Sequence, residues 1–175
     1  TDRFNDNKLN MRWIFLRNPK NTFYSLGTDG LTLNSLPVNI SDSESPSAIF
    51  CRQQHNTFAA ETQVSFAPKS EKELAGMALL QNEQYNFVFG KTMLNGKTAI
   101  TLNRAEGNSA VISSVRLNDN EASQPLKLKI SGDGRYYDFM YAIGNGEWQV
   151  LARGVDAVNL STHRSGGFIG ACIAL

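Results

Sequence analysis

The sequence predicts an all-β domain, an antiparallel β-sandwich of roughly a dozen short strands. Apolar and polar residues alternate with a period of two in many segments, which is typical of strands buried on one face. Turn signals that contain glycine separate these segments at short intervals, and no segment keeps a helical apolar stripe through three turns. We therefore expect one domain over residues 1–175, a length sufficient to bury a real core.

The first half of the chain contains turn signals, one loop and three strand-like segments. GTDG at 27–30 is a turn signal, and the polar segment 35–47, which holds two prolines, predicts a surface loop. Residues 49–55 (IFCRQQH) and 57–66 (TFAAETQVSF) are strand-like. Residues 69–84 predict a polar turn followed by a strand, because a glycine interrupts any helical pattern there.

Two hairpins are predicted in the second half of the chain. Asn95-Gly96 and the GNG at 144–146 supply the positive φ angles that tight turns demand. The strands that these turns join, together with two further strand-like segments, are 87–94, 97–104, 126–130, 137–143, 147–152 and 168–175.

Charge and hydrophobicity argue against two classes of partner. Lys and Arg number 17 against 16 Asp and Glu, so we expect neither nucleic acid nor an acidic membrane surface, both of which need clustered positive charge. No apolar run approaches the ~20 residues of a membrane helix, and no signal peptide opens the chain. The abrupt start at Thr1 is compatible with the removal of a leader or a preceding domain.

The two cysteines, Cys51 and Cys172, both lie in apolar strand-like segments. We expect reduced thiols in the core, since free cysteine is readily buried. A single disulfide between them is the alternative, and it would indicate an oxidising compartment.

A search for catalytic groups finds no site that the residues alone support. His55 and His163 lack a further metal ligand at suitable spacing, and neither a nucleophile elbow nor a phosphate-binding loop is present. A glycosidase needs two carboxylates, and the pairs at i, i+2 spacing lie in polar turns. We expect those pairs to be solvated loop charges: Asp42/Glu44, Glu71/Glu73 and Asp119/Glu121.

Four motifs in a fixed order give a more specific indication: DRFNDNKLNMRWIFLRNP (2–19), SPSAIFCRQQH (45–55), AGMALLQNEQYNFVFG (75–90) and GGFIGACIAL (166–175). They resemble the C-terminal β-sandwich of glycoside hydrolase family 43, the β-xylosidases and α-L-arabinofuranosidases of xylan breakdown. The resemblance covers nearly the whole chain and implies a concanavalin A-like jelly roll. In that family a five-bladed propeller precedes the sandwich and carries the catalytic carboxylates, which have no counterpart here.

The resemblance implies an ancillary module that packs on the propeller and completes its pocket for xylo- or arabino-oligosaccharides. The chain alone would then be non-catalytic, because it lacks the propeller, and it would come from a larger two-domain glycosidase. The family's sandwich also continues into a further strand that this sequence does not contain. A free-standing carbohydrate-binding module with its own sugar site on a concave sheet is the alternative. An independent concanavalin-like hydrolase is disfavoured by the missing carboxylate pair.

Four polar residues in the strand-like segment 49–55 are site candidates. In a strand, Arg52 and Gln54 would lie on one side, with Gln53 and His55 on the other. They form either an internal hydrogen-bond network, since Arg brings five donors, or a polar patch that faces the propeller or a sugar. Three aromatic residues are available to accompany such a patch: Trp13, Tyr85 and Trp148.

Phe168 is the other candidate for the pocket. Gly166 and Gly167 before it allow close backbone approach, so that the loop can project an aromatic tip. The resemblance implies that this ring reaches the rim of the propeller's pocket and is exposed in the present chain. The alternative is that Phe168 begins the last strand with its ring in the core.

The N-terminal residues Asp2, Asn5 and Asp6 are candidate calcium ligands, because they offer hard oxygen atoms. Related jelly rolls often hold a structural calcium ion near this strand, and the resemblance implies no other cofactor. The alternative is a polar strand end that is capped by its own side chains.

Overall fold

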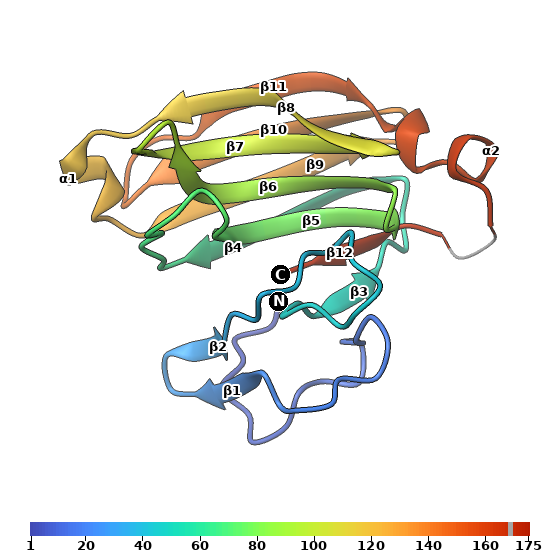
Figure 1. The fold of residues 1–175 in the computed structure, drawn as a ribbon, viewed down its shortest axis with the longest axis horizontal. Coiled ribbons are helices and arrows are strands. Elements are labelled where there is room, and N and C mark those ends of the chain that lie inside the picture. Colours follow the sequence, from blue (N-terminus) through green and yellow to red (C-terminus); the bar gives the residue numbers. More distant parts are fainter. Residues whose placement is uncertain (168–169) are drawn as a thin grey trace.

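The computed structural model describes residues 1–167 and 170–175 (Figure 1). The all-β prediction is confirmed, since the twelve strands of the described residues form two large antiparallel sheets and one small hairpin. The six-stranded sheet contains, in spatial order, β3 (Phe50–Arg52), β12 (Cys172–Ala174), β5 (Leu74–Asn82), β6 (Tyr85–Leu94), β7 (Lys97–Glu106) and β8 (Asn108–Arg116). The four-stranded sheet contains β11 (Gln149–Asp156), β10 (Tyr136–Ile143), β9 (Leu126–Asp133) and β4 (Thr57–Val64).

Alternation along each strand decides which side chains enter the space between the sheets. On β9, Leu128 and Ile130 are fully buried, whereas Lys129 between them points outward and pairs with Glu61 of β4. A shift of register by one residue would exchange these faces. The register is therefore set by the apolar pattern that the sequence displays.

Both predicted hairpins are confirmed. Asn95 and Gly96 turn β6 into β7 with φ values of 51° and 71°. The segment 144–148 joins β10 to β11, whose pairing contains two register shifts near Phe139. The segment 69–84 also behaves as predicted, because a polar turn leads into β5 rather than into a helix.

Gly76 explains why β5 and β6 approach each other so closely. It pairs directly with Gly90, and a Cβ atom at position 76 would lie 2.5 Å from Gly90 Cα and 3.0 Å from Leu128 Cδ1. Atoms at such distances overlap, so the two strands need a residue without a side chain at this point.

The main core lies between the two large sheets. Phe139 of β10 is fully buried and makes ring contacts with Phe87, Phe89 and Tyr137 at centroid distances of 5.9, 5.5 and 6.5 Å. Leucine and isoleucine side chains from both sheets fill the remaining volume. Close packing of this kind supplies most of the apolar burial that holds the sandwich together.

Residues 1–48, which we call the N-terminal lobe, form a second unit against the six-stranded sheet. The lobe contains the hairpin of β1 (Tyr24–Gly27) and β2 (Gly30–Leu33), which stands apart from the large sheets in Figure 1. Leu16, Ile40 and Ala48 of the lobe pack on a small outer cluster of the sheet. That outer cluster consists of Phe50, Ala78, Leu80, Cys172 and Ala174.

The two cysteines are free thiols. Cys172 belongs to the outer cluster, whereas Cys51 pairs across from Ile173, which packs on the main core. Side chains on opposite faces of one sheet do not have the geometry of a disulfide. Burial raises the pKa of both thiols.

Candidate functional site

One end of the sandwich, which we call the loop end, brings together the segments that the sequence singled out. It is formed by residues 52–55, which begin at the last residue of β3, by the β5–β6 and β9–β10 turns, and by the segment that follows β11. That last segment contains the 3-10 helix η1 (Ala157–Leu160) and the short helix α2 (Thr162–Ser165), at the right in Figure 1.

The prediction that Arg52, Gln53, Gln54 and His55 share one strand is wrong. β3 ends at Arg52, and the next three residues lie outside any strand. Gln53 N still donates to Ala171 O, the residue before β12, and the chain then turns into β4 at Thr57. The four side chains therefore do not alternate between two faces.

Gln53 makes two hydrogen bonds at the centre of this block. Its Oε1 accepts a hydrogen bond from Tyr137 Oη at 3.3 Å, and its Nε2 donates to His55 O at 3.1 Å. Gln53 is half-buried, whereas Arg52, Gln54 and His55 are exposed. The geometry is thus that of one internal anchor and three side chains on the surface.

The segment after α2 is fastened on both sides of its glycines. Asn82 Nδ2 donates to Ser165 O at 3.3 Å, and Arg164 of α2 forms an ion pair with Glu106. On the other side, Arg52 Nη1 donates to Gly170 O at 3.5 Å. Phe168, the predicted aromatic tip, lies outside the described residues and stays a prediction.

Glycines give the ends of this segment a backbone that other residues rarely adopt. Gly166, Gly167 and Gly170 have φ values of 71°, 74° and 73°. A Cβ atom at any of the three would meet no atom within 4 Å. Glycine is therefore favoured here by conformation and not by crowding.

Only one of the three aromatic residues noted in the sequence lies at the loop end. Tyr85 begins β6 there, and its N–H donates to Asn82 Oδ1. Trp13 lies in the N-terminal lobe against Phe4, and Trp148 lies beside Lys129 of β9.

Sequence reasoning missed an aromatic residue at the loop end. Tyr136 follows the β9–β10 turn, is 39% exposed, and carries the Arg135 guanidinium 5.2 Å from its ring centroid. Asp133 Oδ1 accepts the N–H groups of both residues and fixes this turn. The adjacent Arg and Tyr after the GDG turn were the signal that could have revealed the pair.

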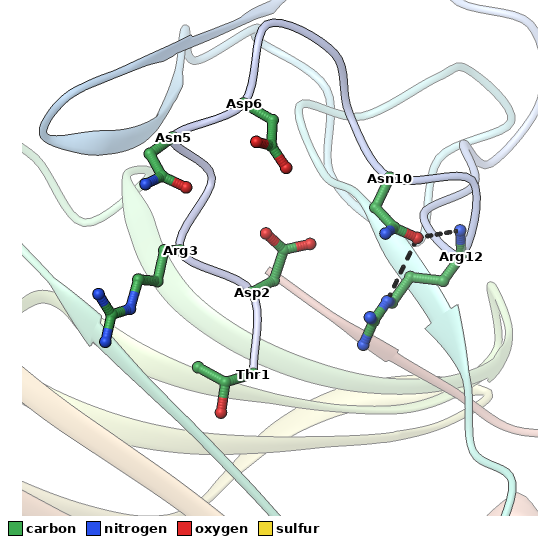
Figure 2. A pocket seen from close by; sticks show the side chains of 7 residues that line it. All are labelled: Thr1, Asp2, Arg3, Asn5, Asp6, Asn10 and Arg12. Atoms are coloured by element: carbon green, nitrogen blue, oxygen red, sulfur yellow. Dashed lines mark hydrogen bonds between the residues drawn. The ribbon is translucent and has the colours of Figure 1, made fainter.

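Asp2, Asn5 and Asp6 line a cavity of about 380 Å³ at the N-terminus together with Arg3, Asn10 and Arg12. Figure 2 shows the carboxylates of Asp2 and Asp6 pointing toward each other. Asp2 accepts hydrogen bonds from Trp13 Nε1 at 2.8 Å and Phe4 N at 3.0 Å. The Trp13 bond is the main cause that holds the pKa of Asp2 below its usual value.

A calcium ion at this cavity stays a prediction. In residues 1–167 and 170–175, no three His, Cys, Asp or Glu side chains gather as a metal site would require. Backbone and amide oxygens can also bind calcium, so a melting temperature measured with calcium and with a chelator tests the site directly.

Each of the three carboxylate pairs has a member with a structural partner, and Asp119 and Glu121 lie in α1 (Asp119–Ala122) rather than in the expected loop. Glu73 accepts from Lys69 N, and Glu121 completes a capping box with Asn118 at α1. Asp42 accepts from Asn39 N in the lobe. His163 lies in α2, where it is exposed.

No helix in the described part of the chain is long and apolar enough to cross a membrane.

Comparison with known proteins identifies a family model and relatives that match the whole chain or nearly all of it. The family model for the "Beta xylosidase C-terminal Concanavalin A-like domain" matches residues 1–175. The non-reducing end α-L-arabinofuranosidase BoGH43B of Bacteroides ovatus is 26% identical over 99% of the chain, and the xylosidase/arabinosidase of Butyrivibrio fibrisolvens is 28% identical over 98%. The chain spans about a third of these relatives, 32% and 33% of their lengths.

Solved structures give the same result. A GH43_12 protein retrieved from a capybara gut metagenome superposes with a TM-score of 0.88 at 28% identity, and the Bacteroides ovatus xyloglucan PUL GH43B with 0.90 at 26%. In both cases 99% of this chain matches about a third of the other, 33% and 34%. The chain therefore belongs to the family of β-xylosidase C-terminal concanavalin A-like domains found in glycoside hydrolase family 43 enzymes.

Proposed function

We propose that this domain is an ancillary module that packs on a catalytic five-bladed propeller and completes its pocket for xylo- or arabino-oligosaccharides. The relatives support the setting, because they are longer family 43 proteins named as xylosidases or arabinofuranosidases. The domain would contribute shape and exclusion of water, while the propeller would supply the two carboxylates that cleave the bond.

One observation carries the proposal. Arg52, Gln54 and His55 are exposed at the loop end, and Arg52 is hydrogen-bonded to Gly170 next to the predicted aromatic tip. Exposed polar groups beside a projected ring are suited to the rim of an interface, where charged and polar residues concentrate. A purely internal network would have buried these side chains.

Phe168 would be the part of the module that reaches the sugar. Its ring would displace water at the pocket, which strengthens the electrostatic interactions of the propeller's acid and base. In the longer protein that contains the propeller, we expect Phe168→Ala to lower kcat/KM by about tenfold, equivalent to ~1.4 kcal/mol of transition-state stabilisation. The melting temperature of the isolated 175-residue chain should hardly change.

Arg52→Ala tests the docking surface separately. It should leave the stability of the isolated chain unchanged and reduce activity only in the longer protein, because the side chain is exposed. Arg116→Ala is a matched control, since Arg116 is an exposed arginine on β8, distant in the sheet order from β3. Full activity of both Arg52→Ala and Phe168→Ala would refute the proposal. A core-like loss of ~3–5 kcal/mol on Phe168→Ala would do so as well.

A further inference from the structure

The outer face of the four-stranded sheet carries an unusual set of side chains and reaches the loop end at Tyr136. Both cation–aromatic pairs found in the described residues lie along it: Arg135 over Tyr136, and Lys129 with its Nζ 5.5 Å from the ring centroid of Trp148. We call this surface the four-strand face, defined by Glu61, Lys129, Tyr136, Asp138, Trp148 and Arg153.

Register shows that these residues share one face. Leu128, Ile130 and Tyr137 point into the main core, so their neighbours in the strands, Lys129 and Tyr136 among them, point outward. Lys129 pairs across from Glu61 on one side and Met140 on the other. Tyr136 lies four residues before Met140 on the same strand, a separation of about 13 Å at ~3.3 Å per residue.

Ion pairs occupy the space between the two rings. Lys129 Nζ lies 2.8 Å from Glu61 Oε1, and Arg153 Nε lies 3.7 Å from Asp138 Oδ2. All four side chains remain partly exposed, from 27% for Lys129 to 69% for Arg153. The four-strand face thus offers alternating hydrogen-bond donors and acceptors, with an aromatic ring toward each end.

This chemistry favours one kind of ligand. A protein interface is depleted of charged residues at its core, whereas two ion pairs flank the apolar pair of Met140 and Val150 on this face. Nucleic acid needs clustered positive charge, whereas Glu61 and Asp138 neutralise Lys129 and Arg153 on this face. A neutral sugar chain has hydroxyl groups that both donate and accept, and apolar ring faces that pack on aromatic side chains.

We propose that the four-strand face binds an extended neutral oligosaccharide between Trp148 and Tyr136, as a carbohydrate site separate from the pocket of the catalytic domain. The choice of xylo-oligosaccharides as ligands rests on the proposed function, but the site itself needs no second domain. It would hold the module on a polysaccharide while the catalytic domain acts on chain ends.

Titration of the 175-residue chain with xylo-oligosaccharides of two to six units tests the site. The indole N–H resonance of Trp148, assigned with Trp148→Phe, should shift in a saturable manner, and affinity should rise with length until the sugar spans both rings. Tyr136→Ala should weaken the hexasaccharide roughly tenfold or less and leave the disaccharide unchanged. Glu61→Gln should weaken both and leave the melting temperature similar.

Tyr24→Ala is the matched aromatic control, because Tyr24 lies in the N-terminal lobe. No saturable shift of Trp148 would overturn the site, and so would binding that neither Tyr136→Ala nor Glu61→Gln alters. The proposed function fails on other measurements, namely unchanged activity of Arg52→Ala and Phe168→Ala in the longer protein. The two ideas can therefore be refuted independently.

Discussion

The main core and the outer cluster are two apolar regions on opposite faces of the same six-stranded sheet, and they differ in size and in composition. The main core joins both large sheets through fourteen buried side chains, with Phe139 at its aromatic centre. The outer cluster has five buried residues and joins the sheet to the N-terminal lobe. Since apolar burial is the dominant favourable contribution to stability, we expect the lobe to be the weaker unit.

Polar contacts supplement the outer cluster. Ile14 and Phe50 exchange two backbone hydrogen bonds at 2.8 and 2.9 Å, Arg17 pairs with Glu83, and Asn86 Nδ2 donates to Ser41 Oγ. Exposed ion pairs add little to stability. We therefore expect the sandwich to keep its structure under conditions that release the lobe, since many proteins unfold locally before they unfold globally.

The two tryptophans report on the two regions separately. Trp13 lies in the lobe, and Trp148 lies against the four-stranded sheet. Trp13→Phe and Trp148→Phe therefore give single-tryptophan proteins whose fluorescence follows one region at a time.

The largest effect is expected from Phe139→Ala. Removal of a fully buried ring that contacts three aromatic neighbours should lower the free energy of unfolding by about 3–5 kcal/mol. Both tryptophan signals should move together in urea, because the lobe cannot persist without the sheet. A Trp13 transition that stays at its wild-type midpoint would contradict this dependence.

Phe50→Ala is the matched truncation in the outer cluster, since Phe50 is 2% exposed. We expect the Trp13 transition to shift to lower urea, while the Trp148 transition moves much less. The free energy of unfolding of the lobe, followed by Trp13, should fall by up to ~3 kcal/mol. This is the low end of Phe→Ala losses, because the site borders a loop and can relax. Two transitions that still coincide would show that lobe and sandwich unfold as one unit.

Acid should loosen the lobe through Asp2. Its pKa is held below the usual 3.8, mainly by the hydrogen bond from Trp13, so its contribution is present above pH 3.8 and is lost as pH falls from 3.8 toward the folded-state pKa. Asp2→Asn keeps an acceptor but does not titrate. The acid-induced change in Trp13 fluorescence should be smaller in this variant, and an identical change would exclude Asp2 as its cause.

The smallest effect is expected when the pH is raised into the alkaline range, and it concerns the stability of the main core. Lys91 is 2% exposed and donates to Ala122 O at 2.5 Å, and burial lowers its pKa from 10.5. Between the folded-state pKa and 10.5 the unfolded chain binds more protons, so this residue makes stability rise with pH. The difference in stability between wild type and Lys91→Met, followed by Trp148, should therefore grow in favour of wild type in that range.

Most strands could be predicted because alternation and turn signals are local properties of the sequence. LKLKI in β9 and Asn95-Gly96 between β6 and β7 needed no knowledge of their partners. The order of the strands in the sheets could not be predicted, since it depends on contacts between distant segments. The lobe was missed for the same reason, because Leu16 and Ile40 find their apolar partners far along the chain.

The candidate site was predicted only in part. The polar block at 52–55 was recognised, but the end of β3 at Arg52 depends on where its partner strand β12 begins, at Cys172 far along the chain. The family resemblance implied that this block and the glycine-rich segment both belong to the same pocket. No local pattern in the sequence indicated that they lie close together. Tyr136 was missed as a site residue, because no local pattern shows which face of a sandwich stays uncovered.

The position of β12 has a consequence for the synthesis of the protein. This strand is the last in the described chain, yet it lies between β3 and β5, where Cys172 pairs with both Arg52 and Leu80. While β12 is still inside the ribosome, β3 has no neighbour through which to join the sheet. The outer cluster also lacks Cys172 and Ala174, so we expect the lobe to stay undocked on the nascent chain until residues 172–174 emerge.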